Sequence, residues 1–264
     1  MAVIKAEFFS VNLWRSVQFH AVIPNDVPPM MRENNPNYDR PMKTVYLLHG
    51  HSGCDTDWLY NTPLTQLAGQ YNVCFITPGA ENWFYLDGEA CDRKYCKYVG
   101  EELVDYTRKL FGLSDKKEDT FIGGYSMGGF GALHTALAYP DTFSKVMALS
   151  SALIIYDVKD MQPGTRNDIA DYDYYRMVFG DLTKVDVGVN NPEQLVLKNQ
   201  AEGKKIPAIY MAIGTEDFLY ENNQIFKRFL EEHNVDFTYT EGPGNHDFIF
   251  WNEHLPRAIE WFLK

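Results

Sequence analysis

The stretch Thr120-Phe-Ile-Gly-Gly-Tyr-Ser-Met-Gly-Gly-Phe-Gly-Ala132 is the part of the sequence that decides the fold. It begins as a short apolar strand and leads directly into a helix of small side chains that Pro140 ends. Between the two lies a G-x-S-x-G pattern, which is weak alone but typical of a serine held on a sharp strand-to-helix turn. Glycines suit such a turn because the backbone is strained and the flanking chains approach closely. This context predicts that Ser126 is a nucleophile rather than an incidental serine in a glycine-rich turn.

Short apolar runs alternate with helical patterns on both sides of this turn. We expect strands at residues 44–48, 73–77, 120–123, 146–150, 206–213 and 237–240, and helices at 63–70, 97–111, 129–139, 224–233 and 255–263. Such alternation predicts an α/β fold with a mostly parallel central sheet and helices on both faces. Residues 2–23 read instead as two antiparallel strands joined near Arg15-Ser16, which would form one edge of the sheet.

Residues 151–201 interrupt this rhythm. They contain no clear strand and are rich in Tyr, Asp and Asn. A connection of that length between sheet elements is more often functional than idle. We therefore expect one domain over residues 1–264, with residues 151–201 as a cap-like insertion near the active site. The proline-rich residues 24–42 are expected to form an exposed loop.

Composition excludes several classes of protein. The 264 residues carry a net charge of −12, which argues against nucleic-acid binding, and a hydrophobic fraction of 45%, which argues against disorder. The uncharged stretch from Thr120 to Pro140 contains too many glycines for a membrane span. We expect no membrane partner. The absence of a signal-peptide pattern and four cysteines without zinc-ligand spacing favour a cytoplasmic protein with reduced thiols.

A serine nucleophile needs a base, and in this type of sheet the order along the chain is serine, acid, histidine. The candidates for the base are His233, His246 and His254. His246 lies in the loop Gly242-Pro-Gly-Asn-His-Asp247 after the last strand, where it could reach over the carboxyl edge of the sheet. His233 at a helix end and His254 near the last helix are expected to be structural.

The acid is expected in the loop after the strand at residues 206–213. We choose Asp217, which would orient the imidazole of His246, over the adjacent Glu216. The oxyanion of the tetrahedral intermediate would need backbone N–H donors. The amide of Met127 follows the nucleophile directly, and the amide of His51 lies in the loop after the strand at residues 44–48.

Two further interpretations concern the surroundings of these residues. A metal site built from His49, His51 and Asp55 is conceivable, but their spacing matches no known ligand set, so no metal and no cofactor are expected. Four aromatic residues near the proposed site are expected to bind substrate, with packing in the core as the alternative. These are Trp58, Trp83, Tyr85 and Tyr125.

Motifs spread over nearly the whole chain resemble the esterase D group of α/β-hydrolases, and within it the bacterial tributyrin esterases. The motifs are Leu47-Leu-His-Gly-His-Ser-Gly53 with Trp58, Asn82-Trp83, Gly123-Gly-Tyr-Ser-Met-Gly-Gly129, Val178-Phe-Gly-Asp181, Gly214-Thr-Glu-Asp-Phe-Leu-Tyr220 and Gly244-Asn-His246. The resemblance implies the α/β-hydrolase fold, a Ser126–Asp217–His246 triad, an oxyanion hole at His51 and Met127, and hydrolysis of short acyl esters. Members of the group differ in the regions corresponding to residues 151–201 and to the loop around Trp83–Tyr98, so substrate choice does not follow from the resemblance.

These observations together predict a serine carboxylesterase that hydrolyses short acyl esters, including acetyl or feruloyl groups on carbohydrates, through an acyl-enzyme on Ser126. The partner would be a small-molecule or oligosaccharide ester, and a homo-oligomer is left open. Alternative activities on the same triad are an S-formylglutathione-type thioesterase and an acyltransferase. A carbohydrate-binding module on a hydrolase scaffold is the non-enzymatic alternative.

Overall fold

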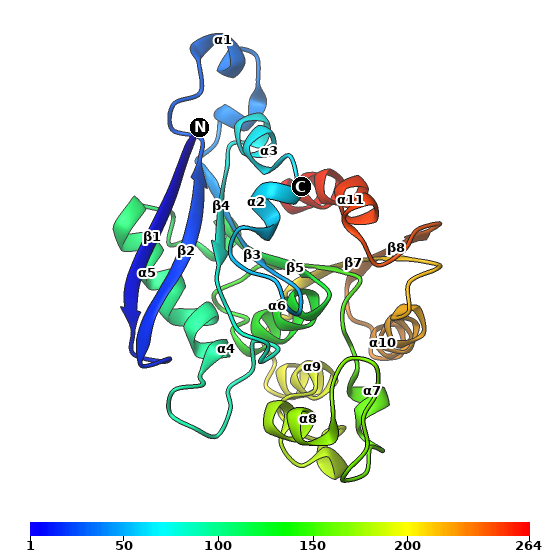
Figure 1. Cartoon of the computed structure of the whole chain (residues 1–264). Helices are drawn as coiled ribbons and strands as arrows, with labels where there is room; N and C mark the ends of the chain where they lie inside the picture. The colour runs from blue at the N-terminus through cyan, green and yellow to red at the C-terminus, as the bar shows by residue number, and fades with distance from the viewer.

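A computed structural model describes residues 1–264, and its centre is an eight-stranded sheet with the order β1-β2-β4-β3-β5-β6-β7-β8 (Figure 1). β2 pairs antiparallel with β1 and β4, and all other neighbours are parallel. This confirms the predicted sheet with an antiparallel N-terminal edge. The strands are β1 (Ala2–Ser10), β2 (Arg15–Ile23), β3 (Lys43–Leu48), β4 (Val73–Pro78), β5 (Thr120–Tyr125), β6 (Lys145–Leu149), β7 (Ala208–Gly214) and β8 (Phe237–Gly242).

Helices cover both faces of this sheet, as the alternating pattern predicted. α3 and α11 pack on one face, and α6 and α10 contact the sheet from the other side. None of the helices combines the length and apolar character needed to cross a bilayer. The helices and helical turns are α1 (Pro29–Arg32), η1 (Pro36–Tyr38), α2 (Asp57–Asn61), α3 (Leu64–Tyr71), α4 (Tyr95–Lys97), the π-helical turn η2 (Tyr98–Glu102), α5 (Leu103–Phe111), η3 (Lys117–Asp119), α6 (Met127–Ala138), α7 (Ile155–Val158), α8 (Tyr172–Phe179), η4 (Leu182–Lys184), α9 (Pro192–Ala201), α10 (Tyr220–Glu232) and α11 (Phe248–Leu263).

Strand β3 shows how the sheet separates two hydrophobic cores. Its side chains alternate between the faces because successive residues of a strand point in opposite directions. Tyr46 and Leu48 belong to the core on the α6 side, and Val45 and Leu47 belong to the core on the α3 and α11 side. A strand that is buried on both faces is therefore continuously apolar in sequence, and this pattern predicts the strand at residues 44–48.

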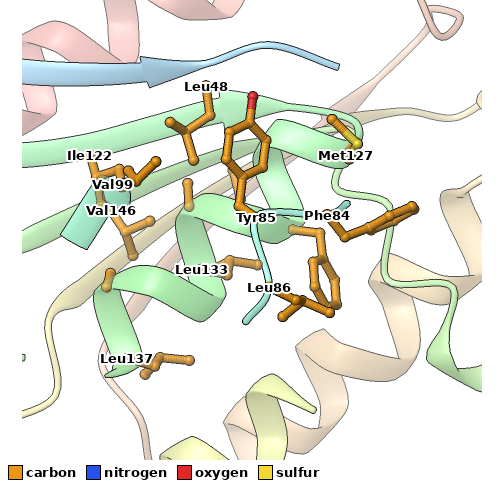
Figure 2. Close-up of a cluster of buried hydrophobic side chains, with 14 of the residues drawn as sticks. Leu48, Phe84, Tyr85, Leu86, Val99, Ile122, Met127, Leu133, Leu137 and Val146 are labelled. Atoms are coloured by element: carbon orange, nitrogen blue, oxygen red, sulfur yellow. The ribbon is translucent and has the colours of Figure 1, made fainter. Parts of the chain in front are cut away.

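The core on the α6 side is the larger of the two, with 46 buried residues. Figure 2 shows Ile122 of β5 and Val146 of β6 beside Leu133 and Leu137 of α6. Tyr85 lies in the same cluster although it comes from the loop after β4, and its side chain is fully buried. The segment that contains Tyr85 is therefore anchored in the core close to the start of α6.

Several boundaries differ by a few residues from the sequence-based expectation, and two of the differences have a clear side-chain cause or signal. The first is the turn between β1 and β2, which lies at residues 11–14 rather than at Arg15-Ser16, because Ser10 pairs directly with Arg15. The side chain of Glu102 explains this position. Its carboxylate accepts hydrogen bonds from the Ser10 hydroxyl and from the amide of Val11, so a distant helical segment holds the turn in place.

The second is the start of the last helix, which lies at Phe248 rather than at residue 255. The carboxylate of Asp247 caps this helix by accepting hydrogen bonds from the amides of Ile249 and Phe250. Pro256 lies inside the helix, whereas in sequence a proline is more typical of a first helical turn. Residues 24–42 likewise contain the short turns α1 and η1 within the expected loop.

The segment 151–201 contains no strand and consists of α7, α8, η4 and α9 with their connections. α9 packs against α6. The side chain of a buried histidine in α6 also contacts the residues that precede α9. His134 of α6 donates from Nε2 to the carbonyl of Val189, at 3.0 Å. The cap-like segment is thus tied to the helix that begins at the serine turn.

Burial lowers the pKa of His134 to about 4 from its ordinary value of 6.5, so the ring is neutral in the native protein at neutral pH. Below pH 6.5 the unfolded chain binds a proton there that the native state does not bind. This residue therefore costs stability progressively as the pH falls from about 6.5 to about 4, by about 3 kcal/mol in all. We expect His134→Gln to show a shallower loss of unfolding free energy across that window, measured by urea denaturation at each pH. Equal slopes for the two proteins would contradict this account.

Candidate active site

Ser126 occupies a strained turn between β5 and α6. Its φ of 55° and ψ of −123° lie in a region that L-residues rarely adopt. Neighbouring backbone leaves no room for side chains around it. A Cβ atom on Gly124 would lie 2.2 Å from the carbonyl oxygen of Gly128, and one on Gly128 would lie 2.2 Å from that of Leu48. The amide of Ser126 donates to the carbonyl of Leu149 at 2.9 Å, which fixes the turn against β6.

The structure brings Ser126, His246 and Asp217 into one hydrogen-bonded chain. The Ser126 Oγ lies 2.9 Å from Nε2 of His246, and Nδ1 of His246 lies 2.8 Å from Oδ2 of Asp217. Asp217 follows β7 and His246 follows β8, so two adjacent parallel strands deliver both residues to the same edge of the sheet. The other oxygen of Asp217 accepts from the amide of Leu219 at 2.9 Å. Asp217 is therefore held in place independently of the histidine.

The alternatives for the acid and the base, Glu216, His233 and His254, do not take part in this hydrogen-bonded chain. A carboxylate oxygen of Glu216 accepts from the amide of Gly244, so this side chain braces the loop that carries His246. His233 lies at the end of α10, where its Nδ1 donates to the carbonyl of Phe229 at 2.9 Å. His254 is buried within α11. None of them shares a hydrogen bond with Ser126.

The imidazole of His246 is packed between aromatic rings. The ring centroid of Phe218 lies 4.6 Å from that of His246, and Trp251 meets the imidazole edge-on at 5.1 Å. The Phe218 side chain is 67% exposed although it is large and apolar. The Phe218 ring therefore covers one side of the His246 imidazole. It also lines the cavity that contains Ser126.

Two backbone amides lie close to Ser126, one directly after it in the chain and one in the loop that follows β3. Met127 is the first residue of α6, so its amide is one of the donors that a helix leaves without an internal partner. The amide of His51 makes no hydrogen bond to another residue. Partial burial lowers the pKa of the His51 ring, which keeps the ring neutral beside these donors. Both residues line the same cavity as Ser126.

A second segment holds the loop that carries His51. The side-chain oxygen of Asn82 accepts from the amide of Ser52 at 2.8 Å, and Ser52 has a φ of 62°. The backbone carbonyl of Asn82 accepts from the hydroxyl of Tyr174 in α8 at 2.5 Å. Trp83 stacks on the ring of Tyr174, with the centroids 6.5 Å apart. Asn82 thus connects the loop of His51 with the cap-like segment.

His49 fastens the start of the same loop. Its Nε2 accepts from the amide of Ala80 and its carbonyl accepts from the hydroxyl of Tyr85, each at 3.0 Å. Burial lowers the pKa of His49, so the ring stays neutral in this position. Sequence reasoning found no role for His49 and missed Asn82 as a contact of this loop. The motif Asn82-Trp83 was the only signal that could have pointed to it.

The aromatic residues expected to bind substrate do not line this cavity. Trp58 is fully buried and donates from Nε1 to the carbonyl of Leu48 at 3.0 Å. Tyr85 is fully buried, and Tyr125 is 5% exposed with its hydroxyl 2.6 Å from Asp57 Oδ2. Trp83 is partly exposed but lies outside the cavity wall. The burial of Trp58, Tyr85 and Tyr125 in the two cores therefore supports the alternative interpretation, in which these rings pack in the core.

The cavity at Ser126 has a volume of about 550 Å³. Its polar groups besides the serine and the two histidines are Asp157, Asn167 and Asp168, all from the cap-like segment. Sequence analysis placed this segment near the site but could not say which of its side chains face inward. The apolar part of the wall consists of Phe84, Met127, Ala152, Ile154, Ile169, Tyr175, Phe218 and Leu219.

The structure offers no arrangement of three or more His, Cys, Asp or Glu side chains that could hold a metal ion. His49 is engaged with Ala80, and Asp55 lies 2.8 Å from the Nδ1 of His20. The four cysteines are unpaired, two of them exposed and two buried.

Comparisons with known proteins identify a matching family and a similar esterase. Residues 28–262 match the model of the Esterase family. The chain is 40% identical to an acetyl esterase of Caldicellulosiruptor saccharolyticus. The alignment spans 264 residues, which is 100% of this chain and 99% of the relative.

Two solved structures from Staphylococcus aureus are similar over the whole chain. One is a fluorophosphonate-binding serine hydrolase with substrate bound, with a TM-score of 0.85, 30% identity and coverage of 100% of this chain and 98% of that one. The other is an S-formylglutathione hydrolase, with a TM-score of 0.82, 30% identity and coverage of 100% and 99%. Such coverage means that the similarity includes the segment 151–201 as well as the sheet.

The close approach of α6 to β3 makes Gly128 sensitive to a single added methyl group. We expect Gly128→Ala to lower the free energy of unfolding by about 3 kcal/mol, because β3 or α6 must move to relieve the clash with Leu48. Guanidinium denaturation measures the change. Gly242→Ala is the matched control, since nothing lies within 4 Å of a Cβ at that position. Equal stabilities of the two variants would refute the packing argument.

Proposed function

Because this chain belongs to the Esterase family and is a serine carboxylic ester hydrolase, we propose that Ser126, His246 and Asp217 are its catalytic triad. The observation that carries the proposal is the pair of hydrogen bonds, 2.9 Å and 2.8 Å long, that joins the three side chains. The serine also lies on a strained turn and lines the cavity, so its hydroxyl is accessible to a substrate there.

In the first half of the reaction, Ser126 Oγ attacks the ester carbonyl while Nε2 of His246 takes the hydroxyl proton. Asp217 holds the proton on Nδ1, which leaves Nε2 free to accept, and it stabilises the imidazolium that forms. The carbonyl oxygen becomes negatively charged and accepts hydrogen bonds from the amides of His51 and Met127. The carbon–oxygen bond to the alcohol then breaks, and His246 gives its proton to the leaving oxygen.

In the second half, the acyl group on Ser126 is hydrolysed by water. His246 removes a proton from the water as it attacks the acyl carbonyl, and the same two amides stabilise the second tetrahedral intermediate. The bond to Ser126 Oγ breaks, and the proton on His246 returns to that oxygen. The products are the carboxylic acid and the free enzyme, so no cofactor is consumed.

We propose short acyl esters, acetyl esters first among them, as the substrates. The name of the 40% identical relative, an acetyl esterase, supports this choice. A second, shallower groove of about 350 Å³ adjoins the cavity at His51 and is lined by Asn82, Arg166, Asp171 and Tyr174 among others. Its polar side chains suit a hydroxyl-rich alcohol such as a sugar, and an oligosaccharide ester would occupy both spaces. The unpaired cysteines fit the reducing cytoplasm as its location.

Hydrolysis of S-formylglutathione is the second candidate, and the 30% identical hydrolase of that name favours it. The charges on the cavity wall oppose it, because Asp157 and Asp168 would repel the carboxylates of glutathione. A kinetic panel of p-nitrophenyl esters of increasing chain length, acetylated xylan, methyl ferulate and S-formylglutathione separates these substrates. A higher kcat/KM for S-formylglutathione than for every acetyl ester would reverse the order of the two candidates.

Ser126→Ala removes the proposed nucleophile. We expect ester turnover to fall by at least about 10⁴-fold and labelling by a fluorophosphonate probe to disappear, with the thermal midpoint close to that of the native protein. Ser16→Ala, in the exposed start of β2, is the matched control and should keep full activity and labelling. Labelling that survives in Ser126→Ala would show that another residue is the nucleophile.

Asn82 is proposed as a positioning residue for the oxyanion hole, because its side-chain oxygen fixes the loop that carries the His51 amide. We expect Asn82→Ala to lower kcat by about 10- to 100-fold with little change in KM for p-nitrophenyl acetate. Asn82→Asp keeps an acceptor oxygen for the amide of Ser52 and should recover most of the lost kcat. A merely structural role would instead lower the thermal midpoint of both variants and leave kcat per folded enzyme unchanged.

A further inference from the structure

Strand β1 forms an open edge of the sheet. It is nine residues long and pairs only with β2, so its other side carries backbone groups without a partner strand (Figure 1). An edge of this length is a template for pairing with another chain, and proteins usually shorten, bend or cover such edges. No other segment of this chain pairs with the open side of β1, since no backbone hydrogen bond outside the sheet involves the amides of residues 2–9.

The two faces of β1 differ, because one face is packed against the core and the other is exposed to solvent. Ala2, Ile4, Ala6 and Phe8 pack against the core, and the ring of Phe8 stacks on Tyr106 with the centroids 4.0 Å apart. The end of the strand is fixed as well, because the carboxylate of Glu102 holds residues 10–12. A strand already ordered in the single chain loses little conformational entropy when it pairs with a partner.

The outward-facing residues of β1 form a self-complementary pattern. Val3, Lys5, Glu7 and Phe9 are exposed, with 46% exposure at Val3 and 57% at Phe9. The two charges are opposite and lie at equal distances on either side of Ala6, and the two apolar side chains lie symmetrically outside them. The strand is therefore matched to a second copy of itself that runs in the opposite direction.

We propose that two copies of this chain pair antiparallel along β1, about a two-fold axis at Ala6, to form one continuous sheet through both subunits. In this register Lys5 lies opposite Glu7 of the partner subunit, and Val3 lies opposite Phe9 of the partner subunit. Opposite charges and apolar pairs directly across an antiparallel ladder are both stabilising. The interface is isologous, so each contact occurs twice.

Other registers are less favourable for physical reasons. A two-fold axis at Lys5 or at Glu7 would place that charged residue opposite its own copy, and like charges across a ladder are destabilising. A shift by one residue would set outward-facing residues opposite core-facing ones and break the match of the two faces. The axis at Ala6 pairs both charges and both apolar side chains at once.

The dimer would leave the proposed active site open. β1 is separated from β5, which leads to Ser126, by β2, β4 and β3. Its formation therefore does not depend on the proposed triad, and either proposal can fail without the other. The active-site cavities of the two subunits would lie on separate parts of the joint sheet.

Analytical ultracentrifugation of the full chain at micromolar concentrations, together with light scattering, tests the proposal. We expect the native protein to sediment as a dimer. Lys5→Glu and Glu7→Lys each replace two attractive pairs by two repulsive ones and should raise the dissociation constant at least about tenfold. The double variant Lys5→Glu/Glu7→Lys restores opposite charges in every pair and should return the dissociation constant to near the native value.

Turnover of p-nitrophenyl acetate, measured on all four proteins, shows that the variants are folded and should change less than about twofold. A native protein that is monomeric at every concentration would overturn the proposal. A dimer that is equally stable in both single variants would also overturn it, because the two copies would then associate through another surface. Failure of the double variant to recover would refute the register with its axis at Ala6.

Discussion

The close approach of three backbone segments at Ser126 is the constraint on which the rest of the site depends. Gly124 and Gly128 let β5, α6 and the end of β3 come so near that a methyl group would not fit between them. This contact turns the chain sharply, so the serine hydroxyl points into the cavity and the amide of Met127 opens the helix beside it. The end of β3 also brings the loop with His51 to the same place.

The parallel sheet supplies the remaining groups through a similar contact. β7 and β8 are neighbours, and the loops that follow them pack so tightly that a Cβ on Gly214 would lie 2.0 Å from the carbonyl of Gly244. Asp217 and His246 lie in those two loops, and the hydrogen bond between them crosses the contact. The site is therefore assembled from strand ends whose order along the sheet differs from their order in the chain.

The cap-like segment 151–201 contributes what the sheet cannot. It supplies the carboxylates and much of the apolar wall of the cavity, and through Tyr174 it bonds to Asn82, which holds the loop of His51. A change in this segment would therefore alter both the shape of the cavity and the position of an amide donor. The β1 edge of the sheet contributes no residue to the site, so it can form an interface between subunits without changing the cavity.

The sequence by itself determined the α/β architecture and the identity of the three residues that meet at the site. Both follow from local rules, namely apolar strand runs, a glycine-flanked serine, and acid and histidine after successive strands. Only the tertiary structure decided the turn at residues 11–14, the start of α11 at Phe248, and the burial of Trp58, Tyr85 and Tyr125 behind the site. Those features depend on contacts between segments far apart in the chain, such as Glu102 with Ser10, and no local pattern encodes which segments will meet.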